Sequence, residues 1–397
     1  MPVLNKNKKR LIIWSVAIPL FVLVFIYSFL RFVFIPYVID VKINGLEQYF
    51  SSQEAIQAPA FHKDLFIADL HADTLLWNRS IAERSRSGHV DIPRLIEGNI
   101  ALQGFSIVTQ APRNISIEKN ANTSDSIFWL AVFTGYPVKS FTHLSERALF
   151  QINKLRQAAH ERDDFFIITN HQELEEYLKK RSINKKITAG WISVEGAQAL
   201  DEDLTQLDRL FEAGVRMMSP AHLTDSKMSG SQQGLEKQGL TELGKKWLKK
   251  MDEKKMIIDL AHASTSTIDD VLELSERAPL VSHTGIKGAC DNNRNLTDLQ
   301  IQKIAKKGGL IGIGFWSEAT CGSKVEDIVK SILYVKNLVG VSFVALGSDW
   351  DGYVRTPVDA ARIGLLTAKL AEAGLSQSEV SQIMGANVLQ FLLKNFP

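Results

Sequence analysis

Eight short apolar segments of β type recur along this chain after residue 63, and segments of helix length separate them. Three of the separating segments, Leu204 to Ala213, Thr241 to Lys254 and Val325 to Leu338, have the apolar spacing of surface helices. Strands that alternate with helices form parallel sheets, because each helix carries the chain back to the start of the next strand. The expected strands are Phe66 to Leu70, Leu102 to Val108, Ile192 to Val194, Val215 to Ser219, Met256 to Leu260, Leu280 to Ser282, Leu310 to Phe315 and Val344 to Gly347.

Eight such units favour an α/β fold of the (β/α)8 TIM barrel type over residues 63 to 397. A barrel of this kind uses ~250 residues or more as one domain, so the 397-residue length does not require a second domain. The composition, 45% hydrophobic and 23% charged, is that of a folded globular chain. The interval between the second and third strands is long and includes a strand-like segment at Phe165 to Thr169. We therefore expect an insertion after the second strand.

Twenty uncharged residues, Leu11 to Leu30, precede this domain. As a helix, a segment of this length crosses ~30 Å of hydrocarbon. It is longer than the apolar core of a typical signal peptide, and no cleavage-type motif follows it closely. We therefore interpret residues 11 to 35 as a single retained transmembrane helix in preference to a cleaved signal. Residues 36 to 62 are polar and mixed, and we interpret them as a linker that docks on the barrel.

The distribution of charge predicts the orientation of this span and excludes one class of partner. Four basic residues precede the span and only Arg31 follows it closely, so the basic tail of residues 1 to 10 is expected in the cytoplasm and the barrel in the periplasm or outside the cell. Five of the 46 basic residues lie before residue 40, which leaves 41 basic and 44 acidic residues. That balance argues against a nucleic-acid surface. The four basic residues of the tail are Lys6, Lys8, Lys9 and Arg10.

Residues of metal-binding type follow six of the eight expected strands. In a (β/α)8 barrel the carboxyl ends of the strands meet at one mouth, where catalytic residues lie. A single His-x-Asp pair is more often structural, but its recurrence with other histidines and carboxylates around one mouth indicates a metal site. The strand-end residues are His71, Asp73, Glu195, His222, His262, His283 and Asp349.

Five of these side chains predict a site for two metal ions. Neutral imidazoles and carboxylates suit Zn²⁺ and similar divalent ions, and one catalytic zinc needs only three protein ligands. A carboxylate shared between two ions completes a site that activates water and polarises the bond it attacks. The five predicted ligands are His71, Asp73, Glu195, His262 and His283.

After Lys63 the chain contains six sequence motifs whose identity and order match those of a known protein family. It resembles the membrane dipeptidase (renal dipeptidase, peptidase M19) family of the metal-dependent amidohydrolase superfamily. Glu195 occupies the place where other amidohydrolases bridge their metals with a carboxylated lysine, which favours the dipeptidase branch. The motifs are Asp69 to Asp73, Ser193 to Gly196, Gly214 to Arg216 with His222, Ile258 to Ser264, Ser282 to His283 with Arg294 and Asn295, and Gly347 to Gly352.

The resemblance implies a hydrolase that cleaves dipeptides with two Zn²⁺ ions per chain. His71 and Asp73 would bind one ion, His262 and His283 the other, and Glu195 both, with a hydroxide between the ions as the nucleophile. By the same resemblance, His222 contacts the substrate carbonyl or oxyanion, Arg294 binds the substrate carboxylate, and Asp349 transfers protons near the leaving amine. The resemblance also implies a Cys290 to Cys321 disulfide and a possible homodimer.

Some alternatives stay open on the sequence. Pro220 to Thr224, around His222, differs from the mammalian pattern, so the preferred dipeptides and the acceptance of a C-terminal D-residue are undetermined. Another two-metal amidohydrolase activity, such as that of a lactonase, phosphotriesterase or other amidase, uses the same kind of mouth. A membrane-tethered binding protein without catalysis is a third reading, although no predicted ligand is missing. Asp69 and Asp259 are expected to be structural, and Asp351 to brace its loop.

Overall fold

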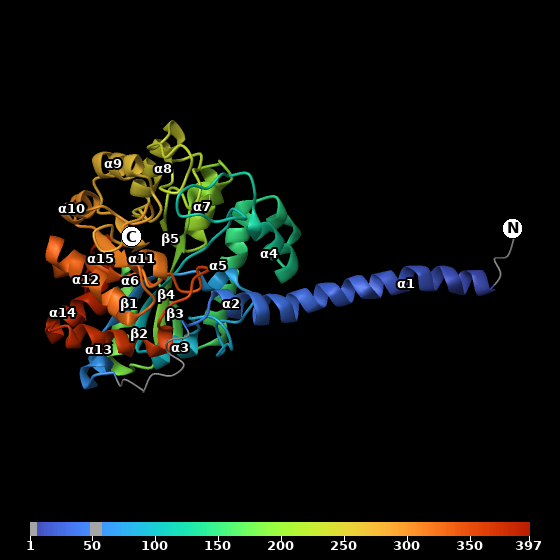
Figure 1. Ribbon diagram of the computed structural model, residues 1–397, viewed down its shortest axis with the longest axis horizontal. Helices are drawn as coiled ribbons and strands as arrows, with labels where there is room; N and C mark the ends of the chain where they lie inside the picture. Colours follow the sequence, from blue (N-terminus) through green and yellow to red (C-terminus); the bar gives the residue numbers. More distant parts are fainter. Residues whose placement is uncertain (1–5, 48–57) are drawn as a thin grey trace.

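The computed structural model describes residues 6–47 and 58–397, with the side chains of residues 6–13, 36 and 37 left out of the description. Its globular part is a parallel barrel surrounded by helices (Figure 1). Eight strands follow one another in the order β6-β5-β4-β2-β1-β9-β8-β7, and a parallel bridge between Asp259 and Leu280 joins the two ends. The predicted (β/α)8 class is confirmed. The strands are β1 (Ile67–Ala72), β2 (Ile100–Phe105), β4 (Thr188–Val194), β5 (Val215–Met218), β6 (Ile257–Ile258), β7 (Leu280–Thr284), β8 (Leu310–Ile313) and β9 (Val344–Leu346).

The predicted insertion after the second strand is present. It contains the strand β3 (Phe165–Ile167), which pairs with the first half of β4 on the edge whose second half pairs with β5. β3 therefore lies beside the barrel and is not one of its eight strands. The helical segments of the insertion are α4 (Ser126–Thr134), η5 (Val138–Phe141), α5 (Leu144–Glu161) and α6 (His171–Ile183).

Most of the remaining helices surround the barrel, and α8 illustrates how the sequence sets where such a helix begins and which face it buries. α8 begins after Thr241, whose side chain accepts a hydrogen bond from the Gly244 N–H, and it buries Trp247 while its lysines face solvent. The longer helices are α3 (Ile92–Glu97), α7 (Thr205–Glu212), α8 (Glu242–Glu253), α9 (Thr265–Leu274), α10 (Asp298–Lys306), α12 (Val325–Val339), α13 (Gly364–Glu372) and α15 (Asn387–Asn395). The shorter ones are η3 (Ala60–Asp64), η4 (Thr74–Leu76), η6 (Ala197–Leu200), α11 (Ser317–Thr320), η7 (Val341–Phe343), η8 (Ala360–Arg362), α14 (Gln377–Ser381) and η9 (Gln382–Ala386).

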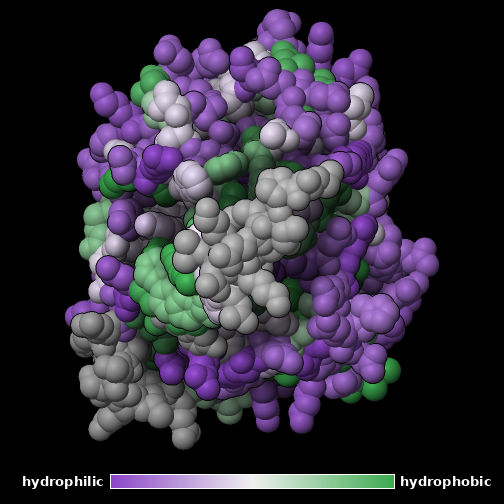
Figure 2. All heavy atoms as spheres, turned by 90° about the vertical axis from the view of Figure 1, so that its right-hand side faces the viewer, coloured by the Kyte–Doolittle hydropathy of each residue, from purple (hydrophilic) through white to green (hydrophobic). Residues whose placement is uncertain are grey.

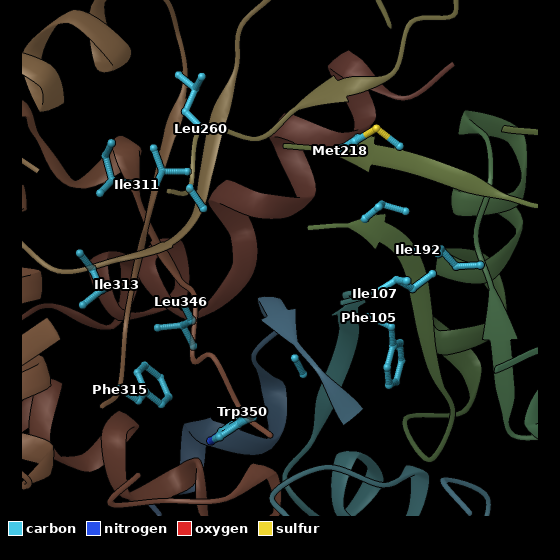
Figure 3. Packing of buried hydrophobic residues seen from close by; sticks show 14 of the residues in the cluster. Phe105, Ile107, Ile192, Met218, Leu260, Ile311, Ile313, Phe315, Leu346 and Trp350 are labelled. Carbon is cyan, nitrogen blue, oxygen red and sulfur yellow. The ribbon is translucent and has the colours of Figure 1, made fainter. Parts of the chain in front are cut away.

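Strand residues divide between two apolar clusters because successive side chains point to opposite faces of a strand. Met218 and Ile311 belong to the larger cluster, which Figure 3 shows together with Ile192 and Phe105. Their neighbours Met217 and Leu310 belong to the second cluster, which includes apolar residues of α15. Both faces of the strands are thus buried, which is typical of parallel sheets.

A long N-terminal helix projects from the barrel (Figure 1). Figure 2 shows the side of the domain from which this helix projects. It comprises α1 (Lys6–Phe29), η1 (Leu30–Asp40) and α2 (Val41–Ile43). Trp14–Ile43 is long and apolar enough to cross a membrane, a property that signal sequences share. The helix continues eight residues beyond the expected end of the span at residue 35, so the first part of the predicted linker is helical. Residues 48–57 of that linker and residues 1–5 of the predicted basic tail lie outside the described residues.

The end of this helix is part of the globular domain. Asp40 is 1% exposed, and its carboxylate accepts hydrogen bonds from Arg79 Nε at 3.0 Å and from the Ser87 hydroxyl at 2.8 Å. Leu46 then forms a parallel bridge with Thr356, in the loop that follows β9. Buried charge and backbone pairing therefore fix the helix to the barrel.

Candidate metal centre

The strand ends bring the predicted site residues together at the mouth of the barrel. All eight are buried, with exposed fractions of 9% or less. His71 and His283 are the fifth and fourth residues of β1 and β7, whereas Glu195 and His262 lie in the turns that follow β4 and β6. The eight are His71, Asp73, Glu195, His222, His262, His283, Arg294 and Asp349.

Glu195 lies between two groups of histidines. Its Oε1 atom is 3.0 Å from His262 Nε2 and 3.3 Å from His283 Nε2. Its Oε2 atom is 3.2 Å from His222 Nε2 and 3.8 Å from His71 Nε2. The two oxygens of one carboxylate therefore face different nitrogen donors, which is the arrangement that a bridging ligand requires.

Three overlapping groups of donor atoms lie close enough to hold an ion. In each group the ligand atoms are within 4.8 Å of one another. Two of the groups correspond to the two ligand sets expected from the sequence, with Glu195 in both, and the third includes Asp349. The groups are His71, Asp73 and Glu195; Glu195, His262 and His283; and His71, His283 and Asp349.

The donors fit a divalent cation. Three buried atoms of the cluster, His71 Nε2, Asp73 Oδ1 and Glu195 Oε1, have no hydrogen-bond partner among the described residues. A buried polar atom without a partner costs about 1–3 kcal/mol, so three of them at one point are explained best by a ligand that satisfies all of them. A set of imidazole nitrogens and carboxylate oxygens is the set that zinc binds. The roles of these residues as ligands stay predictions.

A second layer of side chains orients the histidines. The Ser282 hydroxyl lies 3.2 Å from His71 Nδ1 and 3.0 Å from His283 Nδ1, and it donates to Asp259 Oδ2 at 2.6 Å. Gln233 Oε1 lies 2.9 Å from His262 Nδ1. These contacts leave the Nε2 atoms for the centre of the site. The sequence analysis named Ser282 only as part of the motif with His283 and gave it no role, and it did not name Gln233.

Asp69 and Asp351, which were expected to have structural roles, form buried hydrogen bonds to neighbouring elements. Asp69 accepts hydrogen bonds from the Ser348 N–H at 2.7 Å and from Gln103 Nε2 at 2.7 Å. These contacts hold β1 and β2 to the turn that carries Asp349. Asp351, which is fully buried, accepts hydrogen bonds from the Thr74 hydroxyl at 2.7 Å and the His89 N–H at 2.6 Å, and so braces the residue that follows Asp73.

The backbone is strained at two of the candidate residues. His262 has φ = 63° and Asp349 has φ = 59°, a left-handed conformation that residues other than glycine seldom adopt. Strain of this kind costs about 1–3 kcal/mol and concentrates at functional sites, where the surrounding structure imposes it. Here it turns both side chains at the points where the chain leaves β6 and β9.

Burial and mutual charge set the protonation of the cluster. Burial lowers the pKa of His262 and of His283 well below the ordinary value, which keeps both rings in the neutral form that binds metal. Burial raises the pKa of Glu195 and of Asp349 well above the ordinary range. Burial also disfavours the charged form of His71, but Glu195 and Asp73 outweigh it and raise the pKa of His71 to about 10.

Zinc binding to the metal-free protein at pH 7 is expected to release at least one proton per chain. With a pKa of about 10, His71 is protonated at pH 7 and must lose its proton before Nε2 can bind a metal. Apparent zinc affinity should therefore increase as the pH rises from 6 to 8. Calorimetry in two buffers with different ionisation enthalpies measures the number of protons. The His71→Asn variant should release fewer, and an equal number from both chains would contradict the prediction.

Two further residues line the mouth beside the cluster. Burial lowers the pKa of His222 to about 4, so its imidazole is neutral at physiological pH. Arg294 is 4% exposed, and its guanidinium donates to the His283 carbonyl at 3.0 Å. Among the described residues Arg294 forms no ion pair; burial lowers its pKa, and the nearby carboxylates of Asp349 and Glu195 oppose that effect. A buried cation without an anionic partner is a natural binding site for an anion.

The Cys290–Cys321 disulfide closes a loop of the chain that contains Arg294, α10 and β8. The side chain of Asn295 donates to the Cys290 carbonyl at 2.7 Å and the Ala319 carbonyl at 3.2 Å, so it joins the two ends of this loop. The pairing that the sequence resemblance implied is thus the pairing in the structure. Together with Asn295, it ties the segment around Arg294 to α11 and the residue that follows α11.

A closed parallel barrel whose mouth gathers imidazoles around a shared carboxylate defines the class of metal-dependent barrel hydrolases. Comparison with known proteins gives the family. The family model for membrane dipeptidase (peptidase family M19) matches residues 56–394. The chain belongs to this family of metallopeptidases and is a hydrolase of the dipeptidase type.

Individual relatives agree over most of their length. An uncharacterised dipeptidase of Schizosaccharomyces pombe is 26% identical over 345 residues, which cover 83% of this chain and 78% of the relative. The dipeptidase aclJ of Aspergillus oryzae is 23% identical over 412 residues, which cover 98% and 90%.

Solved structures show the same fold. A metallopeptidase of Rhodobacter sphaeroides, determined with a phosphinate mimic of the dipeptide L-Ala-D-Ala, superposes with a TM-score of 0.70 at 21% identity, covering 84% of this chain and 99% of that one. The probable dipeptidase PvdM of Pseudomonas aeruginosa has a TM-score of 0.70 at 18% identity, covering 85% and 96%.

Proposed function

We propose that this chain is a membrane-anchored zinc dipeptidase that hydrolyses the peptide bond of dipeptides. The observation that carries the proposal is the position of Glu195, whose two oxygens face separate groups of buried donors. His71 and Asp73 would hold one Zn²⁺, His262 and His283 the other, and Glu195 both. When bound, two zinc ions activate water near neutral pH and polarise the bond under attack.

The side chains around the ligands supply the proton transfers and the binding of the dipeptide. Asp349 Oδ1 lies 3.9 Å from His71 Nε2, so the carboxylate borders the place where water and the scissile bond would meet. There it would take the proton of the attacking water and deliver it to the departing amine. Neutral His222, beside Glu195, would donate a hydrogen bond to the oxygen that becomes negative as the carbonyl carbon turns tetrahedral.

Arg294 would bind the C-terminal carboxylate of the dipeptide, because it is a buried guanidinium in need of an anion. We expect Arg294→Lys to raise KM by about 10- to 100-fold with a smaller change in kcat, the equivalent of one charge-assisted interaction. Arg277→Lys, a change at a partly exposed arginine away from the mouth, should leave both unchanged.

A dipeptide amide distinguishes carboxylate binding from a structural role of Arg294. The unmodified chain should discriminate strongly between dipeptide and dipeptide amide, and Arg294→Lys should discriminate much less. Equal discrimination by the two proteins would contradict the assignment.

The anchor and its orientation belong to the same proposal. Residues 11 to 35 would cross the membrane with residues 1 to 10 in the cytoplasm, as the four basic residues before the span predict. The barrel would then face the periplasm or the cell exterior. The Cys290–Cys321 disulfide supports this side of the membrane, because disulfides persist in oxidising compartments.

The substrate class extends to a C-terminal D-residue in this proposal. The Rhodobacter sphaeroides structure, bound to a mimic of L-Ala-D-Ala, supports a test with both stereoisomers. The decisive experiment measures hydrolysis of L-Xaa-L-Xaa and L-Xaa-D-Xaa dipeptides by the full chain in detergent, together with its metal content. About two zinc ions per chain with dipeptide turnover would support the proposal. Full metal occupancy without cleavage of any dipeptide would overturn the substrate class and leave lactones and other amides as the next candidates.

A further inference from the structure

The helix α4 carries no charged residue although most of its residues are only partly buried and Trp129 is exposed. No charged residue occurs from Ser126 to Val138, and only Ile127, Ala131 and Thr134 of the helix are buried. Trp129 is 48% exposed, and Val138, in the turn that follows, is 77% exposed. A surface helix normally directs charged residues to solvent, so an apolar outward face indicates that something other than water covers it.

Aromatic rings make this face continuous. The ring of Trp129 lies 5.2 Å from Phe128 and 6.2 Å from Phe133, measured between centroids, and Phe128 lies 5.9 Å from Phe141. Other large apolar residues exposed on the described part of the barrel include Ile183, Leu274 and Leu299, which lie on three different helices. We call Phe128, Trp129, Phe133 and Val138 the α4 face.

The α4 face adjoins the N-terminal helix. Gly135, which ends α4 with φ = 81°, lies so close to Arg31 that a Cβ atom there would be 2.4 Å from Arg31 Nη1. Leu130 of α4 and Ile39 of η1 pack against the same small apolar cluster. Figure 1 shows α4 at the edge of the domain from which α1 projects.

Arg31 sets the level of this contact relative to a bilayer. It is the first charged residue after twenty uncharged ones and lies about one helical turn before the end of the proposed span at residue 35, from where its side chain can reach the outer interface. Because Gly135 contacts Arg31, the end of α4 lies at the same level. Exposed tryptophan and lysine are typical of this interfacial layer, and Lys139 follows Val138 directly.

We propose that the α4 face rests on the outer surface of the bilayer that α1 crosses, with its side chains at the boundary of headgroups and acyl chains. The inference depends on the proposed membrane anchoring. Covering apolar rings with lipid is favourable in proportion to the apolar area removed from water. The protein would then contact the membrane in two ways, through the helix that crosses it and through the α4 face that rests on it.

The distribution of tryptophans allows a direct test in the full chain reconstituted in vesicles. Of the described tryptophans only Trp14 and Trp129 are exposed, whereas the other five are 7% exposed or less. In a Trp14→Phe chain, phosphatidylcholine brominated near the start of its acyl chains should therefore quench Trp129 alone. We expect brominated lipid to quench the tryptophan fluorescence of the Trp14→Phe chain, and we expect this quenching to be absent in the Trp14→Phe/Trp129→Phe chain.

The Trp129→Phe chain separates failure of this inference from failure of the anchor, because Trp14 then reports on the span. Quenching of Trp14 without quenching of Trp129 would overturn the lipid contact and leave the anchor intact. Absence of quenching at both positions would overturn the anchor as well. Shielding of Trp129 from aqueous iodide without quenching by brominated lipid would assign the α4 face to a second copy of the chain and would also overturn the proposal.

Discussion

Glu195→Gln is expected to lower kcat/KM for a dipeptide at least ~1000-fold, about 4 kcal/mol of transition-state stabilisation. It should also reduce the zinc content of the chain. Glu195 Oε1 and Oε2 face different histidines, so one neutral amide weakens both halves of the site at once. Metal analysis and steady-state kinetics on the same preparation measure the two effects.

The same chemical change elsewhere serves as the control for Glu195→Gln. Glu379 caps α14 on the outside of the barrel, and Glu379→Gln should leave zinc content and kcat/KM unchanged. A Glu195→Gln chain that keeps all its zinc but loses activity would make Glu195 a proton carrier and not a ligand. Normal activity in that variant would remove Glu195 from the site altogether.

Asp351→Ala is expected to lower the free energy of unfolding by about 3–5 kcal/mol, because it removes one of the two carboxylates that pair with the buried Arg79 guanidinium and leaves only Asp40. Asp351 Oδ2 is 2.7 Å from Arg79 Nη2, and both side chains are 5% exposed or less. Burial raises the pKa of Asp351, but Arg79 and His89 outweigh it and hold the pKa well below its usual range. The stabilisation is therefore present above the unfolded pKa of ~4 and is lost as the pH falls below it.

A double-mutant cycle tests whether the Arg79 partnership causes this loss. Asp351→Ala combined with Arg79→Met should cost less than the sum of the two single changes, because each single change already breaks the same Asp351–Arg79 ion pair. Chemical denaturation at pH 7 provides the values. Arg209→Met, which breaks the half-exposed pair with Glu146, should cost less than ~1 kcal/mol. Strict additivity of the Asp351 and Arg79 effects would contradict the explanation.

The sequence predicted the barrel and the gathering of the site residues for one physical reason. In parallel strands, a position at the carboxyl end determines a position at the mouth, so His71, Glu195 and His283 could be placed together without knowledge of the packing. The strand boundaries followed less closely. The expected strand Met256 to Leu260 is reduced to the pair Ile257–Ile258, because the chain bends toward the left-handed His262.

The positions of other residues of the site could not be predicted from the spacing of apolar residues in the sequence. Gln233 reaches His262 from the irregular segment between β5 and α8, where neither strand nor helix spacing constrains the chain. Arg79 and Asp40 belong to segments far apart in sequence from Asp351, and only tertiary structure brings the three together. The continuation of the helix to Ile43 was also missed, because polar residues after Val38 resemble a linker when read without their partners.

The helix that continues without a break from Arg31 to Asp40 has a mechanical consequence. Its far end is tied by Arg79 to the turn that carries Asp349 and Asp351. In a chain anchored as proposed, the catalytic mouth therefore has a set height and tilt above the lipid. The mouth would then meet only those dipeptides that diffuse close to the membrane surface, because the fixed helix does not let the barrel move away from the bilayer.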